Sequence, residues 1–123
     1  MLYLDKRNAA QPLDLFSAAG KIGPAYCTGV GKAMLAHLPP AALDQALARQ
    51  AFHRCTPATI TDPEVLRAEL AEIRGAGHAY DREEHEPGII CCAVPILSRS
   101  GKVLGALSVT STTSRTNLQA LEA

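Results

Sequence analysis

A chain of 123 residues and 13.0 kDa is long enough for one domain with a hydrophobic core and too short for two. Twelve basic residues balance twelve acidic ones, and the resulting net charge of zero argues against direct nucleic-acid binding by this chain. The composition, which is 47% hydrophobic and contains no apolar run of roughly 18 residues, argues against a disordered chain and against a membrane span.

In chain order, the first predicted elements are two short strands over residues 2–5 and 13–17, joined by a polar turn over residues 8–12. The N-terminus lacks the basic stretch and apolar core of a signal peptide, so we expect a cytoplasmic protein.

Three helices are predicted next. The first begins after Thr28, a suitable N-cap, and runs to the proline pair at 39–40. A short second helix carries Leu43, Ala46 and Leu47 on one side. The third begins near residue 62, either with Asp62 as N-cap and Pro63 at the first position or with a capping box from Thr61 to Glu64, and ends at Gly75 or Gly77.

After residue 77 the hydrophobic period changes to two, which predicts strands over residues 77–82, 89–97 and 103–110. Residues 89–97 are apolar on both faces, so we expect a central strand covered on each side. Pro95 predicts a bulge or a strand end within it. A last helix is expected to open within residues 114–123.

Strands on either side of a block of helices indicate an α+β fold with an antiparallel sheet. Side-chain alternation then places Cys91 and Ala93 on one face of the central strand, and Ser108 and Thr110 on one face of the last strand. The two hydroxyls could simply be solvated, or they could line a site.

A second candidate is the glycine-flanked helix start around Gly29, Val30 and Gly31. Free backbone N–H groups at a helix N-terminus favour an anion, and glycine lets a ligand approach closely. A phosphate-binding P-loop is excluded, because Tyr26 stands where that motif needs glycine and Ala33 follows Lys32 where it needs serine or threonine. A small carboxylate remains the better match.

The acidic segment over residues 81–88 is most simply a solvated loop. The four cysteines lack Cys-x-x-Cys spacing and the four histidines are dispersed, so we expect no metal, no cofactor and no disulfide framework. A catalytic cysteine–histidine pair stays open, because such partners are distant in sequence.

Five segments in order closely resemble the C-terminal effector-binding domain of IclR-family transcription regulators: residues 27–36, 56–62, 77–84, 88–96 and 105–110. The resemblance implies a GAF-like antiparallel sheet with helices packed on it and a small ligand pocket. It also implies an N-terminal winged helix-turn-helix that this chain does not contain. We therefore interpret residues 1–123 as a truncated effector-binding domain.

The resemblance further implies the ligand-binding residues. Backbone amides of the glycine-containing helix start would hold the effector carboxylate, and other side chains would supply polar contacts and apolar walls. The implied residues are Gly29, Val30, Asp81, Cys91, Ser108, Thr110, Leu13 and Leu15.

Three functions follow as hypotheses. The first is a non-catalytic sensor of a small carboxylated metabolite, such as a keto acid or sugar acid, that acts through the oligomeric or DNA-binding equilibrium of a homodimeric or homotetrameric regulator. The second is a GAF-type thiol reductase of free methionine sulfoxide, which needs a low-pKa cysteine, although burial of Cys91 in an apolar strand would raise its pKa. The third is a structural dimerisation module. We expect no enzymatic activity and no membrane partner.

Overall fold

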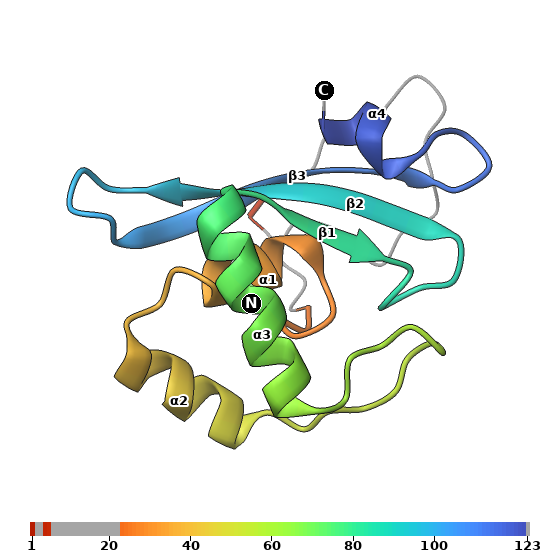
Figure 1. Ribbon diagram of the computed structural model, residues 1–123. Coiled ribbons are helices and arrows are strands. Elements are labelled where there is room, and N and C mark those ends of the chain that lie inside the picture. The colour runs from red at the N-terminus through yellow and green to blue at the C-terminus, as the bar shows by residue number, and fades with distance from the viewer. Residues whose placement is uncertain (2–3, 6–22, 123) are drawn as a thin grey trace.

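The computed structural model describes residues 1, 4–5 and 23–122. Within these residues the chain forms helices on both sides of a three-stranded antiparallel sheet (Figure 1). The elements are α1 (Gly29–Leu35), α2 (Pro40–Arg49), α3 (Pro63–Ala76), β1 (Ala79–Arg82), β2 (Ile89–Leu97), β3 (Val103–Thr112) and α4 (Leu118–Glu122). The predicted strand over 13–17 lies outside the described residues, as does most of the one over 2–5.

Helix α1 begins where the capping signal predicts. The Thr28 side chain accepts a hydrogen bond from the Gly31 N–H at 3.2 Å, which is the N-cap contact. The helix ends at Leu35, earlier than the apolar spacing predicts, because the next turn tightens: the His37 and Leu38 N–H groups donate to the Met34 and Leu35 carbonyls, three residues back.

Proline and glycine set the limits of α2 and α3. Pro40 opens α2 rather than only ending α1. Of the two predicted starts for α3, the structure has the Asp62 cap, whose carboxylate accepts from the Glu64 N–H at 2.9 Å, with Pro63 at the first position. Gly77, with a φ of 82°, ends the helix in the left-handed conformation that favours glycine.

The sheet has the order β1-β2-β3, so β2 is the central strand as predicted. Pro95 lies inside the β2–β3 ladder opposite Ala106, and the irregularity in register falls between Ile96 and Leu97 instead. The strand tolerates this proline because β1 pairs with β2 only as far as Ala93, so beyond that residue the described sheet gives β2 a single neighbour.

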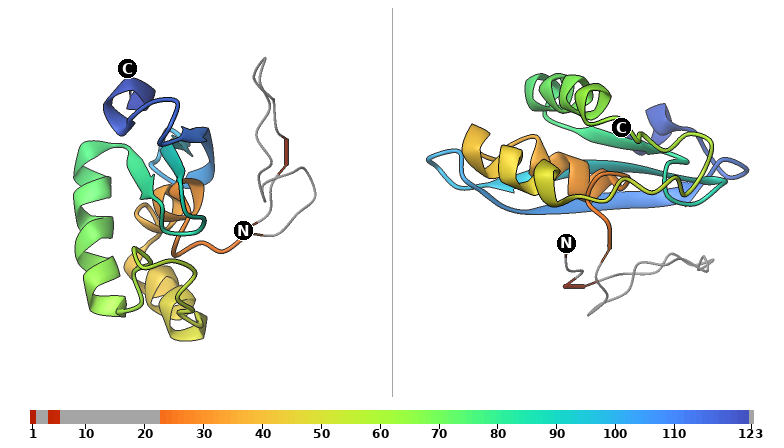
Figure 2. Two further views of the ribbon diagram at one scale, coloured as in Figure 1. Left: turned by 90° about the vertical axis from the view of Figure 1, so that its right-hand side faces the viewer. Right: turned by 90° about the horizontal axis from the view of Figure 1, so that it is seen from below.

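Helices α1, α2 and α3 lie on one side of the sheet and α4 on the other (Figures 1 and 2). Leu47 of α2 and Leu66, Leu70 and Ile73 of α3 are buried in one core with α1 and the strands. Helix α4 contacts β2, and its Glu122 carboxylate is bonded by the Tyr80 hydroxyl of β1. None of the described helices is long and apolar enough to cross a membrane.

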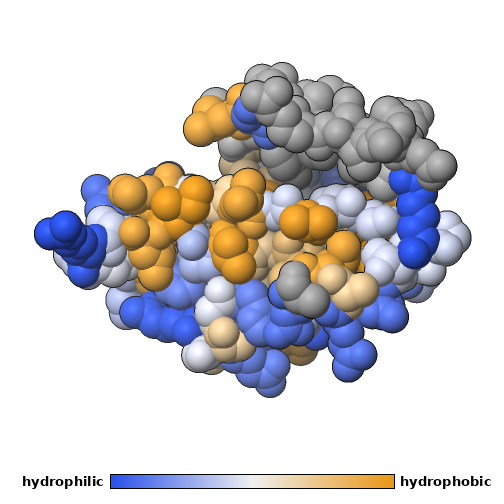
Figure 3. All heavy atoms as spheres, turned by 90° about the horizontal axis from the view of Figure 1, so that it is seen from above, coloured by the Kyte–Doolittle hydropathy of each residue, from blue (hydrophilic) through white to orange (hydrophobic). Residues whose placement is uncertain are grey.

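We call the side of the sheet that faces α1 the inner face, and the opposite side the outer face. The outer face of β2 and β3 is only partly covered, which corrects the expectation of a central strand covered on both sides. Val94, Ile96, Leu107 and Val109 are 43–65% exposed there, and Figure 3 shows hydrophobic side chains gathered over these strands. Farther along β2, Ile90 and Cys92 are buried.

Candidate functional site

Strand register brings the predicted polar residues into two adjacent rows on the inner face. Cys91 of β2 stands opposite Asp81 of β1 and Thr110 of β3. In the next row of the same face, Ala93 stands opposite Ser108. Directly paired residues of antiparallel strands point to the same side of the sheet. The structure therefore assembles Asp81, Cys91, Thr110 and Ser108 from three separate strands into one surface.

The first turn of α1 lies directly against this surface. A Cβ atom placed on Gly29 would be 2.6 Å from the Cys91 Sγ, closer than real Cβ atoms approach, and a tight 3.3 Å from the Ala93 Cβ. Glycine is therefore required at position 29 for the helix to reach the strand. Gly29 and Val30, the first two residues of α1, have N–H groups without an intrahelical partner, since the helix pattern supplies none before the fourth residue.

Gly31 has a different reason to be glycine. A Cβ at this position would lie 2.4 Å from the backbone Cα and carbonyl oxygen of Ala25. The preceding loop is held in that place by Thr28, whose hydroxyl donates to the Pro24 carbonyl at 2.7 Å. Gly29 thus allows α1 to contact the sheet, and Gly31 allows it to pack against the loop that precedes it.

The Cys91 thiol is 5% exposed, and burial raises its pKa to about 11. The hydroxyls of Thr110 and Ser108 lower the pKa, but by less than burial raises it. At neutral pH the residue is a thiol that can donate or accept a weak hydrogen bond, and it is not the thiolate that nucleophilic catalysis requires.

The Asp81 side chain is 5% exposed as well, and burial raises the pKa of its carboxyl group to about 7. One hydrogen bond opposes this change, because Asp81 Oδ1 accepts from the Glu84 N–H at 2.9 Å and such a bond favours the ionised form. The Asp81 carboxyl group can therefore change its protonation state near neutral pH.

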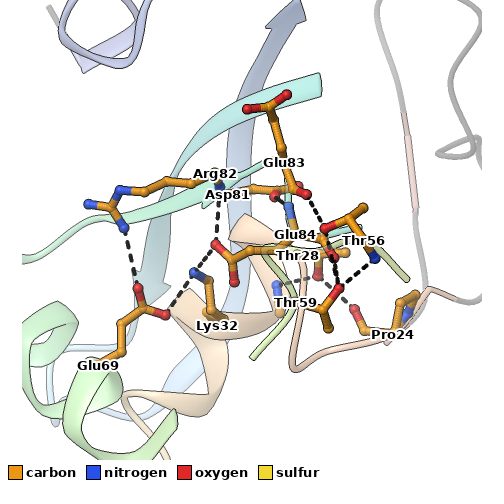
Figure 4. A network of polar contacts seen from close by, with 11 residues as sticks. Pro24, Thr28, Lys32, Thr56, Thr59, Glu69, Asp81, Arg82, Glu83 and Glu84 are labelled. Carbon is orange, nitrogen blue, oxygen red and sulfur yellow. Dashed lines mark hydrogen bonds and ion pairs between the residues drawn. The ribbon is translucent and has the colours of Figure 1, made fainter. Parts of the chain in front are cut away.

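A partly buried ion-pair cluster lies beside Asp81 (Figure 4). Lys32 of α1 is fully buried, and its Nζ is 2.8 Å from a Glu84 oxygen and 2.9 Å from a Glu69 oxygen. The same Glu84 oxygen, Oε2, accepts from the Arg82 N–H, and the Arg82 guanidinium is 3.3 Å from Glu69. The cluster therefore joins α1, α3, β1 and the loop that follows β1.

Two threonines between α2 and α3 hold the same loop from the other side. The Thr56 hydroxyl donates to the Glu83 carbonyl at 2.5 Å, and the Thr59 hydroxyl donates to the Glu84 carbonyl at 2.6 Å. Both threonines are buried, and Thr59 Oγ1 also accepts from the Thr56 N–H. The β1–β2 loop is thus fixed in place, and Glu83 adopts a positive φ of 59° within it.

The prediction of a solvated acidic loop is wrong for Glu84, which is 3% exposed. A signal was available in Lys32, a single cation among the apolar residues of α1 whose burial would require a carboxylate partner. Its partners are 37 and 52 residues away in the chain, so local patterns could not name them.

Leu13 and Leu15 lie outside the described residues, so their expected role as apolar walls stays a prediction. A separate hollow of about 590 Å³ lies between β1, β2 and the residues leading into α4, lined in part by Arg82, Ile90 and Leu118. It contains none of the predicted ligand residues. Among the described residues, no three His, Cys, Asp or Glu side chains are arranged to hold a metal ion.

Residues 1–123 match the family described as bacterial transcriptional regulator IclR C-terminal. The fold and this match define the class of protein as the ligand-binding domain of bacterial transcriptional regulators, which are not enzymes. The chain belongs to the IclR C-terminal family.

The regulator BhcR of Paracoccus denitrificans is 35% identical over 94% of this chain and 41% of its own length. The crystal structure of Thermotoga maritima IclR has a TM-score of 0.92 and 35% identity, and the match covers 98% of this chain and 49% of that one. The inducer-binding domain of the transcription factor PobR from Acinetobacter, a double mutant in complex with 3-hydroxybenzoic acid, has a TM-score of 0.79 and 33% identity over 89% of this chain and 64% of that one. The chain spans about half the length of the curated relatives it matches.

Proposed function

We propose that this domain binds a small carboxylated metabolite, such as a keto acid or a sugar acid, at a site formed by the first turn of α1 and the neighbouring polar residues on the inner face of the sheet. The observation that carries the proposal is the contact of Gly29 with Cys91. It sets the first backbone N–H groups of α1 beside buried Asp81 and Cys91 and half-buried Ser108 and Thr110.

Each residue in the proposed site has a chemical role. The N–H groups of Gly29 and Val30 donate to the effector carboxylate. Asp81, Cys91, Ser108 and Thr110 contact the remaining polar atoms of the effector, and Leu13 and Leu15 form apolar walls. A few polar groups in a mostly apolar surrounding are typical of a site for a small ligand.

The complex named for the PobR inducer-binding domain supports a carboxylic acid as the effector, since 3-hydroxybenzoic acid carries a carboxyl group. Thr110 keeps a hydroxyl but adds a methyl group that a serine would lack, so the site favours effectors that leave room for it. A panel of candidates therefore includes keto acids, sugar acids and aromatic acids.

The role of the whole protein extends this proposal. We infer that the effector shifts the equilibrium of a cytoplasmic homodimer or homotetramer that binds DNA through a winged helix-turn-helix. A ligand can do so only by binding one of two states more tightly than the other.

Isothermal titration calorimetry with the panel tests the site directly. We expect one class of carboxylate to bind, and Ser108→Ala to weaken binding at least several-fold. The matched control is Ser111→Ala, because Ser111 stands opposite Ile90 and belongs to the outer face. Binding by none of the acids, or equal binding by wild type and Ser108→Ala, would contradict the proposed site.

A further inference from the structure

We propose that Asp81 acts in this site as an uncharged carboxyl group, so that a carboxylate effector binds together with one proton held on Asp81. The proposal rests on the proposed function, because it assigns a protonation state to one residue of that site. It makes the domain's response to its effector dependent on pH.

The charges around Asp81 are already balanced without it. Lys32 and Arg82 supply two positive charges, and Glu84 and Glu69 supply two negative charges within ion-pair distance of them. Glu84 Oε1 is buried and has no hydrogen-bond partner among the described residues, so this cluster already has a surplus acceptor. An ionised Asp81 would add a buried negative charge beside a cluster in which, among the described residues, Lys32 and Arg82 are each already paired with a carboxylate.

Two neighbouring thiols and one further carboxylate, Glu86, supply no positive charge to Asp81. Cys91 of β2 and Cys27, which precedes α1, have raised pKa values and are neutral thiols. Glu84 and Glu86 of the following loop disfavour ionisation of Asp81, while Lys32 favours it less strongly than burial opposes it. The pKa of Asp81, raised to about 7 by burial, agrees with the charge count.

The neutral form suits a carboxylate ligand. A protonated carboxyl group donates a hydrogen bond to an acceptor oxygen, whereas an ionised one only accepts and repels a second carboxylate nearby. A site composed of backbone N–H groups, a thiol, hydroxyls and a neutral Asp81 offers donors throughout. No covalent bond is made or broken when the effector binds, because Asp81 keeps the proton that it already carries.

Titration of the ligand-free domain tests the protonation state by itself. The carboxyl carbon of Asp81, followed by ¹³C NMR, should titrate with a midpoint near neutral pH. An ordinary midpoint close to 4 would overturn the proposal while leaving the proposed function standing.

The binding test uses acetate, the smallest carboxylate probe, with the amide signals of Gly29 and Val30 followed by NMR. If only the protonated domain binds and the midpoint is about 7, the apparent Kd should rise about 30-fold from about pH 6 to pH 8.5. In Asp81→Asn this ratio should fall close to one, because an amide cannot ionise. Asp44→Asn, which removes an exposed carboxylate of α2, is the control, and it should keep the wild-type ratio.

The two proposals fail in different ways. A Kd that is equal at both pH values in wild type contradicts the proton-coupled binding alone. Amide signals that acetate does not move at either pH contradict the carboxylate site itself, and the proton-coupled binding with it. A pH dependence that survives in Asp81→Asn places the proton elsewhere and overturns the role of Asp81.

Discussion

Single residues decide whether α1 can reach the sheet. Gly29 and Gly31 are two positions apart, yet a side chain at the first would meet the Cys91 sulfur and a side chain at the second would meet the Ala25 backbone. A side chain can shift more readily than a backbone, so the two positions differ in how much they tolerate.

Gly31→Ala should destabilise the domain by about 1–3 kcal/mol or more, because the added methyl group overlaps backbone atoms at 2.4 Å. The control is Gly75→Ala in α3, where nothing lies within 4 Å and alanine should stabilise the helix by about 0.5–1 kcal/mol. Urea unfolding followed by circular dichroism measures both. Equal effects of the two substitutions would show that the close contact at Gly31 does not constrain the fold.

The raised pKa of Asp81 also predicts how stability depends on pH. The folded pKa, about 7, lies above the unfolded value of about 4, so the folded state binds the proton more tightly. Asp81 therefore lowers stability progressively as pH rises from about 4 to about 7, by on the order of 4 kcal/mol at most, and its effect is constant above that range.

Asp81→Asn should remove the pH-dependent loss of stability that Asp81 causes. The variant should therefore gain stability relative to wild type as pH rises from about 4 to about 7. Chemical denaturation at a series of pH values gives the difference in free energy of unfolding. Asp44→Asn, which changes an exposed carboxylate, is the control. A difference between wild type and Asp81→Asn that does not vary with pH would be inconsistent with a buried, proton-binding Asp81.

At the scale of elements, the loop after β1 is held from two sides, by Lys32 and by the threonines of the segment between α2 and α3. Replacing the Thr59 hydroxyl leaves the Glu84 carbonyl and two backbone N–H groups, of Cys55 and Thr56, without their partner. Buried polar groups left in this way cost about 1–3 kcal/mol each in stability.

Thr59→Val should therefore loosen the loop around Glu84 and speed its amide hydrogen exchange more than that of the β2–β3 ladder. Thr61→Val is the matched control, because its hydroxyl lies at the surface and accepts a hydrogen bond from the exposed Arg54 side chain at 3.2 Å. Unchanged exchange at Glu84 in Thr59→Val would mean that the ion pair with Lys32 alone fixes the loop.

Local sequence patterns predicted the helices and strands well, but they did not predict the contacts between segments that are distant in the chain. The capping of Thr28 and Asp62, the left-handed Gly77 and the three strands each depend on a few neighbouring residues, so the sequence carries their signals. The shared face of Ser108 and Cys91 also follows from alternation once the strands pair. The burial of Lys32 depends instead on α1, α3 and the loop after β1, which come together only in the folded chain. A hydrophobic period within one segment cannot predict contacts between distant segments.

For the whole molecule, the zero net charge predicts how this chain behaves toward DNA. Nucleic-acid affinity comes largely from basic side chains that displace counterions, and here the acidic residues equal the basic ones. We expect no salt-dependent binding of a labelled duplex by the isolated chain in fluorescence anisotropy. Tight binding that weakens steeply with added salt would contradict this prediction.

The partly exposed outer face of β2 and β3 affects how the stability measurements should be made. Environment-sensitive dyes become fluorescent when they bind exposed apolar surface. We therefore expect such dyes to bind the folded domain at Leu107, Val109 and their neighbours, and to fluoresce before it unfolds. The chain also has no tryptophan and only three tyrosines, which leaves little intrinsic emission to follow. Calorimetry and circular dichroism therefore suit this domain, and a dye-based melting curve would begin from a high fluorescent baseline.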